Sequence, residues 1–354
     1  MPGSKADQPE RKLIDLALQG GGSHGAFSWG VLDYLLEDDR IDFAGITAAS
    51  AGAMNAAVMC YGLAKGGPDA ARKELARFWY EISQINSHMG IFSNPLLDHV
   101  PEMQRMTDWL SFTMMESFVH AISPYQFNPL KINPLRDILT DIVDFEVLQN
   151  CKMSRLYVSA TNVRTGRVKV FQTQEVTADA IMASACLPYL YQAVEIGGEA
   201  YWDGGFSGNP PLFPLFYDRA TRDLLVVHIN PIRREEVPRT ATEINNRINE
   251  ISFNSSLLKE MRAVAFVQRL LNDDMLKDEY RDRYSNILFH SIRADKVLRD
   301  LSIASKYNTN WHFFEDLKLR GRETAKLWLN QSYDRIGHES TVDLHTEFLD
   351  NPSI

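Results

Sequence analysis

A run of three glycines follows a short apolar stretch near the start of the chain, in the sequence LALQGGGSHGAFSWG at residues 16–30. Apolar residues over 12–19 predict a buried strand, and the apolar spacing over 26–37 predicts a helix. Three glycines between a strand and a helix predict a tight turn whose backbone amides are exposed where the helix begins. The chain must therefore adopt a fold in which a strand passes through such a turn directly into a helix.

The same alternation of strand and helix recurs immediately afterwards. Residues 45–49 (GITAA) predict a second strand, and the small residues over 51–60 predict a second helix. Two strand–turn–helix units in succession favour an α/β layer with a mostly parallel sheet. Further strands are predicted at 155–163 and 167–172, as a hairpin across Thr165–Gly166, and at 224–230 and 286–290, the last within a charged, mostly helical region.

The glycine run also fits the G-x-G-x-x-G pattern of dinucleotide-binding folds, through the residues GGGSHG. Those folds need an acidic residue at the end of the next strand, which binds the ribose hydroxyls. Here the next strand ends at Ser50, and Asp42 precedes that strand, at its wrong end. The dinucleotide interpretation therefore lacks the acidic residue that would bind the ribose.

Exposed amides at a helix start also stabilise the oxyanion that forms when a carbonyl is attacked. A nucleophile would then lie at the carboxyl end of the neighbouring strand. Ser50 occupies that position in the fragment AASAG, which matches the G-x-S-x-G elbow except that Ala48 replaces the first glycine. Helix capping explains Ser50 taken alone equally well.

A serine nucleophile needs a base, and none of the nine histidines stands in a setting that singles it out. His228 lies in the apolar run LLVVHIN, where a core role is expected. Asp203 lies in the fragment YWDGG, which is also typical of a simple turn. A partly desolvated carboxylate can accept a serine proton directly, so Asp203 is the candidate base.

Three fragments taken together, GGGSHGAF, AASAGAMNAA and YWDGGFSGNPP, resemble the patatin-like phospholipase family. The stretch SACLPYLYQAVEIGGEAYWDGG is similar to the family's approach to its Asp-Gly-Gly, and the resemblance covers about Lys12 to Pro214. It implies a three-layer α/β/α fold with a mostly parallel central sheet. It also implies hydrolysis of an acyl ester through an acyl-enzyme by a Ser–Asp dyad, with no histidine, metal or organic cofactor.

By position, the resemblance makes Ser50 the nucleophile and Asp203 the general base. It assigns the oxyanion turn to Gly20, Gly21, Gly22 and Gly25, and the elbow and the aspartate turn to Ala48, Gly52, Gly204 and Gly205. Family members usually carry Arg or Lys where this chain has His24, so we expect a pH-dependent charge beside the oxyanion turn. We expect the methyl group of Ala48 to be accommodated at the elbow.

Composition limits the partners and the compartment. A formal net charge of −9 excludes long stretches of nucleic acid, because phosphate binding needs a basic face. Three widely spaced cysteines, an odd number, predict thiols in a reducing compartment: Cys60, Cys151 and Cys186. The polar first residues carry no apolar signal core, and no apolar run approaches the roughly 18 residues of a membrane span, so a cytoplasmic protein is the simplest interpretation.

The chain is expected to form a disordered leader over 1–11, a catalytic domain over 12–235 and a mostly helical extension over 236–354 packed on the same domain. A Met-rich helical insertion is expected at about 82–130. Its apolar side chains fit either a core or a lid with peripheral contact to a membrane or lipid body through 85–127; those named for the lid are Trp109, Leu110, Phe112, Met114, Met115 and Phe118.

The sequence thus predicts a serine acyl hydrolase that acts on lipid esters, as a phospholipase A or lysophospholipase does. Two alternatives remain open. The same dyad could serve an esterase or depolymerase acting on a storage polyester or neutral lipid, or an acyltransferase. Alternatively, the chain is a non-catalytic lipid-binding protein with a vestigial site.

Overall fold

The computed structural model describes residues 11–89, 122–152, 154–218, 220–277, 279, 286–295, 297–298, 301 and 303–349. The leader predicted for residues 1–11 therefore lies outside the described residues, except for Arg11. So does most of the Met-rich insertion, including the six residues named for a lid.

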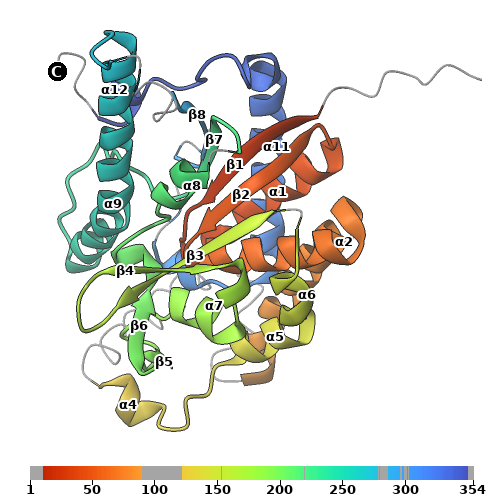
Figure 1. Cartoon of the computed structure of the whole chain (residues 1–354). Coiled ribbons are helices and arrows are strands. Elements are labelled where there is room, and N and C mark those ends of the chain that lie inside the picture. Colours follow the sequence, from red (N-terminus) through yellow and green to blue (C-terminus); the bar gives the residue numbers. More distant parts are fainter. Residues whose placement is uncertain are drawn as a thin grey trace, which may run out of the picture.

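The described residues form one eight-stranded sheet (Figure 1). The strands are β1 (Lys12–Leu18), β2 (Ile41–Ala48), β3 (Arg155–Asn162), β4 (Val168–Gln172), β5 (Val194–Ile196), β6 (Glu199–Asp203), β7 (Asp223–His228) and β8 (Leu288–Arg293). Their order is β5, β6, β3, β2, β1, β7, β8, with β4 also paired to β3. Pairs among β3, β2, β1, β7 and β8 are parallel, and pairs involving β4, β5 or β6 are antiparallel. The predicted mostly parallel sheet is confirmed.

Helices cover both faces of this sheet (Figure 1). One face carries α1 (Gly25–Asp38), α2 (Ala51–Met89), α5 (Pro134–Ile142), α6 (Phe145–Gln149), α7 (Ala178–Ser184) and α11 (Trp311–Ser332). The other carries α8 (Phe213–Asp218), α9 (Ala241–Asn272) and α12 (Leu344–Glu347). Side chains of β7 alternate between the two cores: Leu225 and Val227 pack with the first set, Leu224 and Val226 with the second. A strand buried on both faces needs apolar side chains on both, which explains the consecutive apolar residues 224–227 (LLVV).

The C-terminal region is part of this architecture. β8 extends the sheet beside β7, and α11 packs along α1. Gly30 and Gly321 let these two helices approach closely, because a Cβ at either position would lie about 2 Å from a backbone carbonyl oxygen of the other helix, at 2.0 Å and 2.1 Å. No helix in the described ranges is long and apolar enough to cross a membrane.

Most predicted elements lie within a few residues of the observed ones. The hairpin predicted across Thr165–Gly166 is present, with Gly166 at φ +68°. The helix predicted to end at residue 60 was too short, because α2 continues to Met89 after a break at Gly66 and Gly67, where the backbone leaves helical geometry. Helix-forming residues resume after Pro68, but the predicted helix ended before them.

The topology brings three strand ends together. Leu18 at the end of β1 is in register with Ala48 at the end of β2 and with Val227 near the end of β7. Because these strands are parallel, the segments that follow them all begin at one edge of the sheet, where ligands bind in folds of this type. Asp203 reaches the same region at the end of β6, in register with Ala160 of β3.

Candidate active site

The glycine turn joins β1 to α1 through a short 3₁₀ helix, η1 (Gly22–His24). Gly22 has φ +59°, and a Cβ there would lie 2.6 Å from the backbone oxygen of Lys306, so the turn needs glycine at this position. The Gly20 amide donates a 2.7 Å hydrogen bond to Oδ1 of Asn209, and the Gly25 amide donates within the turn. Of the four glycines predicted to form the oxyanion turn, Gly21 and Gly22 are the two whose amides donate to no group in the described part of the chain.

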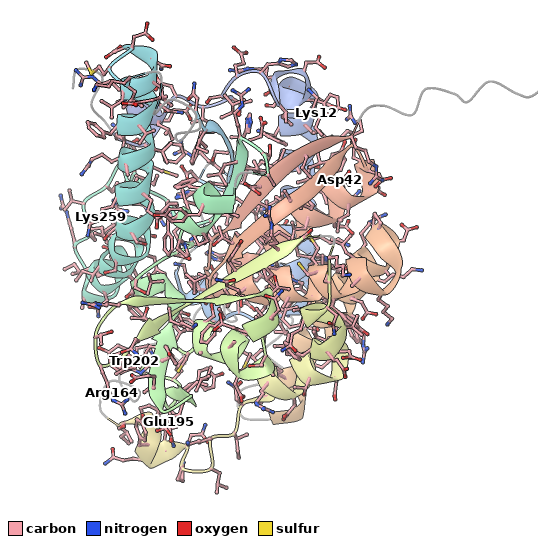
Figure 2. All side chains as sticks on the ribbon, viewed as in Figure 1. Lys12, Asp42, Arg164, Glu195, Trp202 and Lys259 are labelled. Carbon is pink, nitrogen blue, oxygen red and sulfur yellow. The ribbon has the colours of Figure 1, made fainter. Side chains whose placement is uncertain are left out.

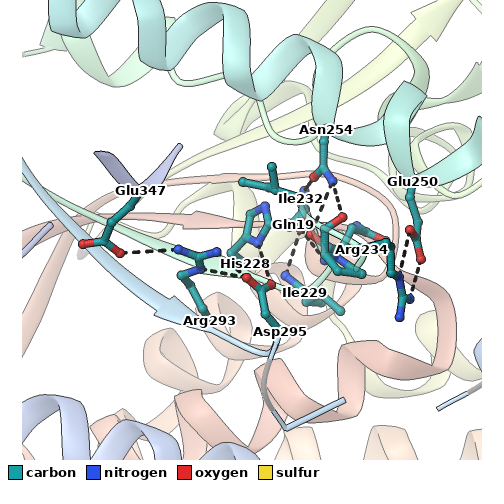
Figure 3. A network of polar contacts seen from close by, with 12 residues as sticks. Gln19, His228, Ile229, Ile232, Arg234, Glu250, Asn254, Arg293, Asp295 and Glu347 are labelled. Atoms are coloured by element: carbon teal, nitrogen blue, oxygen red, sulfur yellow. Dashed lines mark hydrogen bonds and ion pairs between the residues drawn. The ribbon is translucent and has the colours of Figure 1, made fainter. Parts of the chain in front are cut away.

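Buried amide side chains hold this turn against the end of β7. Oε1 of Gln19 accepts hydrogen bonds of 2.8 Å from the amides of Ile229 and Asn230, and its Nε2 donates to Oδ1 of Asn254 on α9 at 2.9 Å (Figure 3). Nδ2 of Asn230 donates to the Gly20 carbonyl at 2.7 Å. Because Gln19, Asn230 and Asn254 are almost completely buried, these bonds are shielded from water and fix the turn firmly.

Ser50 lies in a sharp turn between β2 and α2, with φ +53°. Its amide donates to Oγ of Ser184 on α7 at 2.9 Å, and its carbonyl accepts from the first turn of α2. Gly52 permits this geometry, because a Cβ at that position would lie 2.4 Å from the Leu18 carbonyl oxygen. Ala48, which replaces the usual glycine, is fully buried in the larger core. A left-handed serine at the junction of a strand and a helix is the geometry of a nucleophile elbow.

Asp203 lies next to this elbow at the end of β6 and is completely buried. Its Oδ1 accepts a 2.7 Å hydrogen bond from the Gly205 amide, whereas Oδ2 has no hydrogen bond of standard geometry in the described residues. Desolvation raises the pKa of Asp203 to about 7, against the opposing effects of the Gly205 amide and of a hydrogen-bonding contact with the Ser50 side chain. The Ser50 side chain thus lies close enough to the carboxyl group to lower its pKa, and Oδ2 has no hydrogen-bond partner among the described residues.

The glycine turn is the third part of the site, beside Ser50 and Asp203. A Cβ on Gly20 would lie 2.6 Å from Cβ of Ser50, so the turn and the serine are packed directly against each other. Gly204 lies against the Ser159 carbonyl, and Gly205 lies under the ring of Phe253 from α9. The fold therefore brings the predicted nucleophile, base and glycine turn to one place from three distant parts of the chain.

The expectation of a pH-dependent charge at His24 was wrong. This side chain is buried, and its Nε2 lies 2.7 Å from Oγ of Ser305. Desolvation lowers the pKa of His24 to about 3, and the nearby cations Lys306 and Arg234 lower it further. The imidazole is therefore neutral at physiological pH, and it anchors the turn through Ser305.

The sequence interpretation missed the polar residues that support the site: Asn209, Asn230, Ser184 and Lys306. Of these, Asn209 lies inside the recognised fragment YWDGGFSGNPP, and Ser184 is the first residue of the recognised stretch SACLPYLYQAVEIGGEAYWDGG, but neither was assigned a role. Asn230 and Lys306 come from segments with no motif, and their partners lie far away in the sequence. No local pattern would have found them.

The residues considered for other roles, a ribose-binding acid and a histidine base, lie away from the elbow. Asp42 is at the beginning of β2, beside Lys12 at the beginning of β1 (Figure 2), and it pairs with Arg11 at 2.7 Å. His228 is fully buried and faces Asp295 at 3.6 Å (Figure 3), which is a core role. Within the described ranges, no group of three or more His, Cys, Asp or Glu residues could hold a metal ion.

The fold and the site define a layered α/β protein with a serine at a strand–helix elbow beside a glycine turn. The model of the patatin-like phospholipase family matches residues 16–216, more than half of the chain. The chain belongs to the patatin-like phospholipase family, as the three sequence fragments predicted, and it is therefore a lipid-hydrolysing enzyme. The matched range includes the glycine turn, Ser50 and Asp203.

Solved structures of related shape include VipD from Legionella pneumophila and ExoU from Pseudomonas aeruginosa. The VipD superposition covers 98% of this chain and 75% of VipD, with 13% identity and a TM-score of 0.44. For ExoU, in complex with SpcU from the type III secretion system, it covers 91% of this chain and 53% of ExoU, with 14% identity and a TM-score of 0.33. No curated protein matches the chain in sequence.

Proposed function

We propose that this enzyme hydrolyses acyl esters of phospholipids, with Ser50 as nucleophile and Asp203 as general base. The observation that carries the proposal is a left-handed serine at the elbow with a fully buried carboxyl group near enough for the serine to lower its pKa. Burial raises the pKa of that carboxyl to about 7, so it is basic enough to accept the serine proton and is partly ionised near neutral pH.

In the first half of the reaction, Oγ of Ser50 bonds to the ester carbonyl carbon while its proton passes to Oδ2 of Asp203. The amides of Gly21 and Gly22 receive the negative charge that develops on the carbonyl oxygen. The carbon–oxygen bond to the alcohol then breaks, and the departing alkoxide takes the proton from Asp203. An acyl group remains on Ser50.

In the second half, water enters and loses a proton to Asp203 as its oxygen bonds to the acyl carbon. The same two amides hold the second oxyanion. Collapse of this intermediate breaks the bond to Oγ of Ser50, which recovers the proton, and the fatty acid leaves. Each proton taken up by Asp203 is returned within its half-reaction, so the enzyme ends in its starting state.

We further propose that the enzyme works at a lipid surface, through peripheral contact near the end of the Met-rich insertion. Four large apolar side chains just after residues 90–121 are exposed in the described structure: Tyr125, Phe127, Leu130 and Ile132. Leu130 is the most open, at 80% exposure. Exposed apolar groups of this kind favour insertion into the boundary layer of a lipid aggregate.

The proposal is tested by fatty-acid release from three substrates: phosphatidylcholine vesicles, a triacylglycerol emulsion and a polyester suspension. We expect release from the vesicles, reduced at least about 1,000-fold in Ser50→Ala. Ser28→Ala is the matched control, because Ser28 is buried on α1 with an unpaired hydroxyl and should tolerate the change. Release only from triacylglycerol or polyester would favour the esterase alternative. Lipid binding without any release would favour the non-catalytic alternative.

A further inference from the structure

A partly buried lysine lies behind the glycine turn, where His24 provides no charge. Lys306 belongs to η4 (Ile303–Tyr307), a short 3₁₀ helix of the C-terminal region. Its Nζ donates a 2.8 Å hydrogen bond to Oδ1 of Asn230, and Nδ2 of the same asparagine donates to the Gly20 carbonyl at 2.7 Å. A continuous hydrogen-bonded chain therefore leads from the ammonium group to the backbone of the turn.

The Gly20 carbonyl and the Gly21 amide belong to one peptide unit. Because a peptide unit is planar, the bond from Asn230 that fixes the carbonyl also fixes the direction of the Gly21 N–H. Hydrogen bonds in series polarise one another, and a charged donor at one end strengthens the effect. A positive charge on Lys306 therefore makes the Gly21 amide a stronger donor.

We propose that Lys306 is a positioning residue for this enzyme, which acts through Asn230 to aim and polarise the Gly21 amide toward the oxyanion. The inference rests on the proposed function, because it assigns support to the same oxyanion turn. It gives η4, which no motif marks, a defined role in the reaction.

Two further contacts hold η4 in place. The backbone oxygen of Lys306 lies against Gly22, and Oγ of Ser305 lies 2.7 Å from Nε2 of His24. η4 is thus attached to the turn through both its backbone and its side chains. Lys306 is therefore held at a fixed distance from Asn230, which a positioning role requires.

Several charged groups surround Lys306. His24 from η1, Arg234, Glu250 from α9 and Asp295 line the small cavity around it, and Arg247 pairs with Glu250 at 3.0 Å. Desolvation lowers the pKa of Lys306 to about 8; Glu250 opposes this effect, and Arg234 adds to it. The ammonium is therefore charged at neutral pH and loses its proton at moderately alkaline pH.

The experiment measures kcat and KM for phosphatidylcholine hydrolysis between pH 6 and 10. Lys306→Met should lower kcat about 10- to 50-fold with KM nearly unchanged, less than the roughly 100- to 1,000-fold loss when a direct oxyanion donor is removed. Asn230→Ala should have a similar effect, and the double variant should lose little more than either single one, because both act in one chain. Lys318→Met is the control, since Lys318 is a partly buried lysine on α11 that lies over the ring of Trp29.

The conservative variant separates this role from a structural one. In the wild type, kcat should fall near pH 8 as Lys306 loses its proton. Lys306→Arg keeps a charge that does not titrate, so it should retain kcat within about threefold and should not show that fall. If Lys306 were merely structural, the fall in kcat near pH 8 would remain in Lys306→Arg. Thermal unfolding of each variant shows whether the fold is intact.

The inference is overturned if Lys306→Met keeps wild-type kcat, or if Lys306→Arg keeps the alkaline limb. Should Lys306→Met not fold, Lys306→Arg alone decides. If the wild-type enzyme hydrolyses no lipid ester and a fluorophosphonate does not label Ser50, the proposed function itself fails. An active wild type with a neutral Lys306→Met overturns only the role of Lys306.

Discussion

The amide of Gly20 donates a hydrogen bond of 2.7 Å to Oδ1 of Asn209, 189 residues further along the chain. Both groups are buried at the site. Asn209 follows Asp203 in the same loop, so the segment that carries the candidate base also fixes the glycine turn. The relative position of the base and the oxyanion amides is therefore set by one piece of chain.

Loss of that bond should reduce activity more than stability. In Asn209→Ala the Gly20 amide loses its acceptor and the turn gains freedom, so we expect kcat to fall about 10- to 100-fold. Asn310→Ala is the matched control, because its side chain accepts from the amides of His312 and Phe313 as the cap of α11. The control should lower the free energy of unfolding by about 1 kcal/mol with activity unchanged. Equal loss of activity in both variants would contradict a specific role for Asn209.

The rate should depend on the ionisation of Asp203. The base must be unprotonated, and burial raises the pKa of Asp203 to about 7, so kcat/KM should increase as pH rises through 7. The measurement is a pH profile of kcat/KM with a soluble short-chain ester. Asp15→Asn is the control, because burial also raises the pKa of Asp15 to about 7 but this residue lies within β1, away from the elbow. An acid limb that disappears in Asp15→Asn, or one centred near pH 4, would argue against Asp203 as the base.

Asp15 and Asp203 should lower the stability of the fold above pH 7, whereas an ordinary salt-bridged aspartate raises it there. Their pKa values are about 7 in the folded protein and near 3.8 in the unfolded chain. Between pH 3.8 and pH 7 the folded state therefore binds more protons than the unfolded state. Each group therefore costs stability above pH 7, and that cost disappears as pH falls toward 4. Asp15→Asn and Asp203→Asn should raise Tm relative to wild type by roughly 2–5 °C at pH 8 and by little at pH 5. A Tm difference that is constant from pH 5 to pH 8 would refute this linkage.

The elbow should not tolerate a side chain at Gly52. A Cβ there would lie 2.4 Å from the Leu18 carbonyl oxygen, which belongs to the sheet and cannot move easily. We expect Gly52→Ala to lower the free energy of unfolding by about 2–3 kcal/mol and to abolish activity by displacing Ser50. Gly197→Ala is the comparison, since Gly197 has φ +61° with open space around it and should lose about 1 kcal/mol without an effect on activity. Chemical denaturation and ester hydrolysis of both variants check this.

Much of the fold could be predicted because its signals are local. The strand β1, the glycine turn and α1 follow from a few consecutive residues, and so do β2 and the Ser50 elbow. The hairpin at Gly166 follows from one turn. The length of α2 could not be predicted in the same way, because its second part begins only after the break at Gly66.

The site could be predicted only in part, because burial is not a local property. Ser50 and Asp203 lie in recognisable fragments, but their contact depends on the order of strands in the sheet. His24 was expected to carry a pH-dependent charge, but burial, helped by the nearby cations Lys306 and Arg234, lowers its pKa to about 3. Asn230 and Lys306 contact the turn through side chains that no periodic pattern marks.

In the proposed mechanism, a buried carboxyl group activates Ser50 without a histidine. The most direct test is the rate at which a fluorophosphonate labels Ser50 at pH 8, with the labelled residue identified by peptide mass spectrometry. We expect equal labelling of wild type and Asp15→Asn, and labelling about 100-fold slower in Asp203→Asn. Labelling of folded Asp203→Asn at the wild-type rate, or folded wild-type protein that stays unlabelled at Ser50, would contradict it.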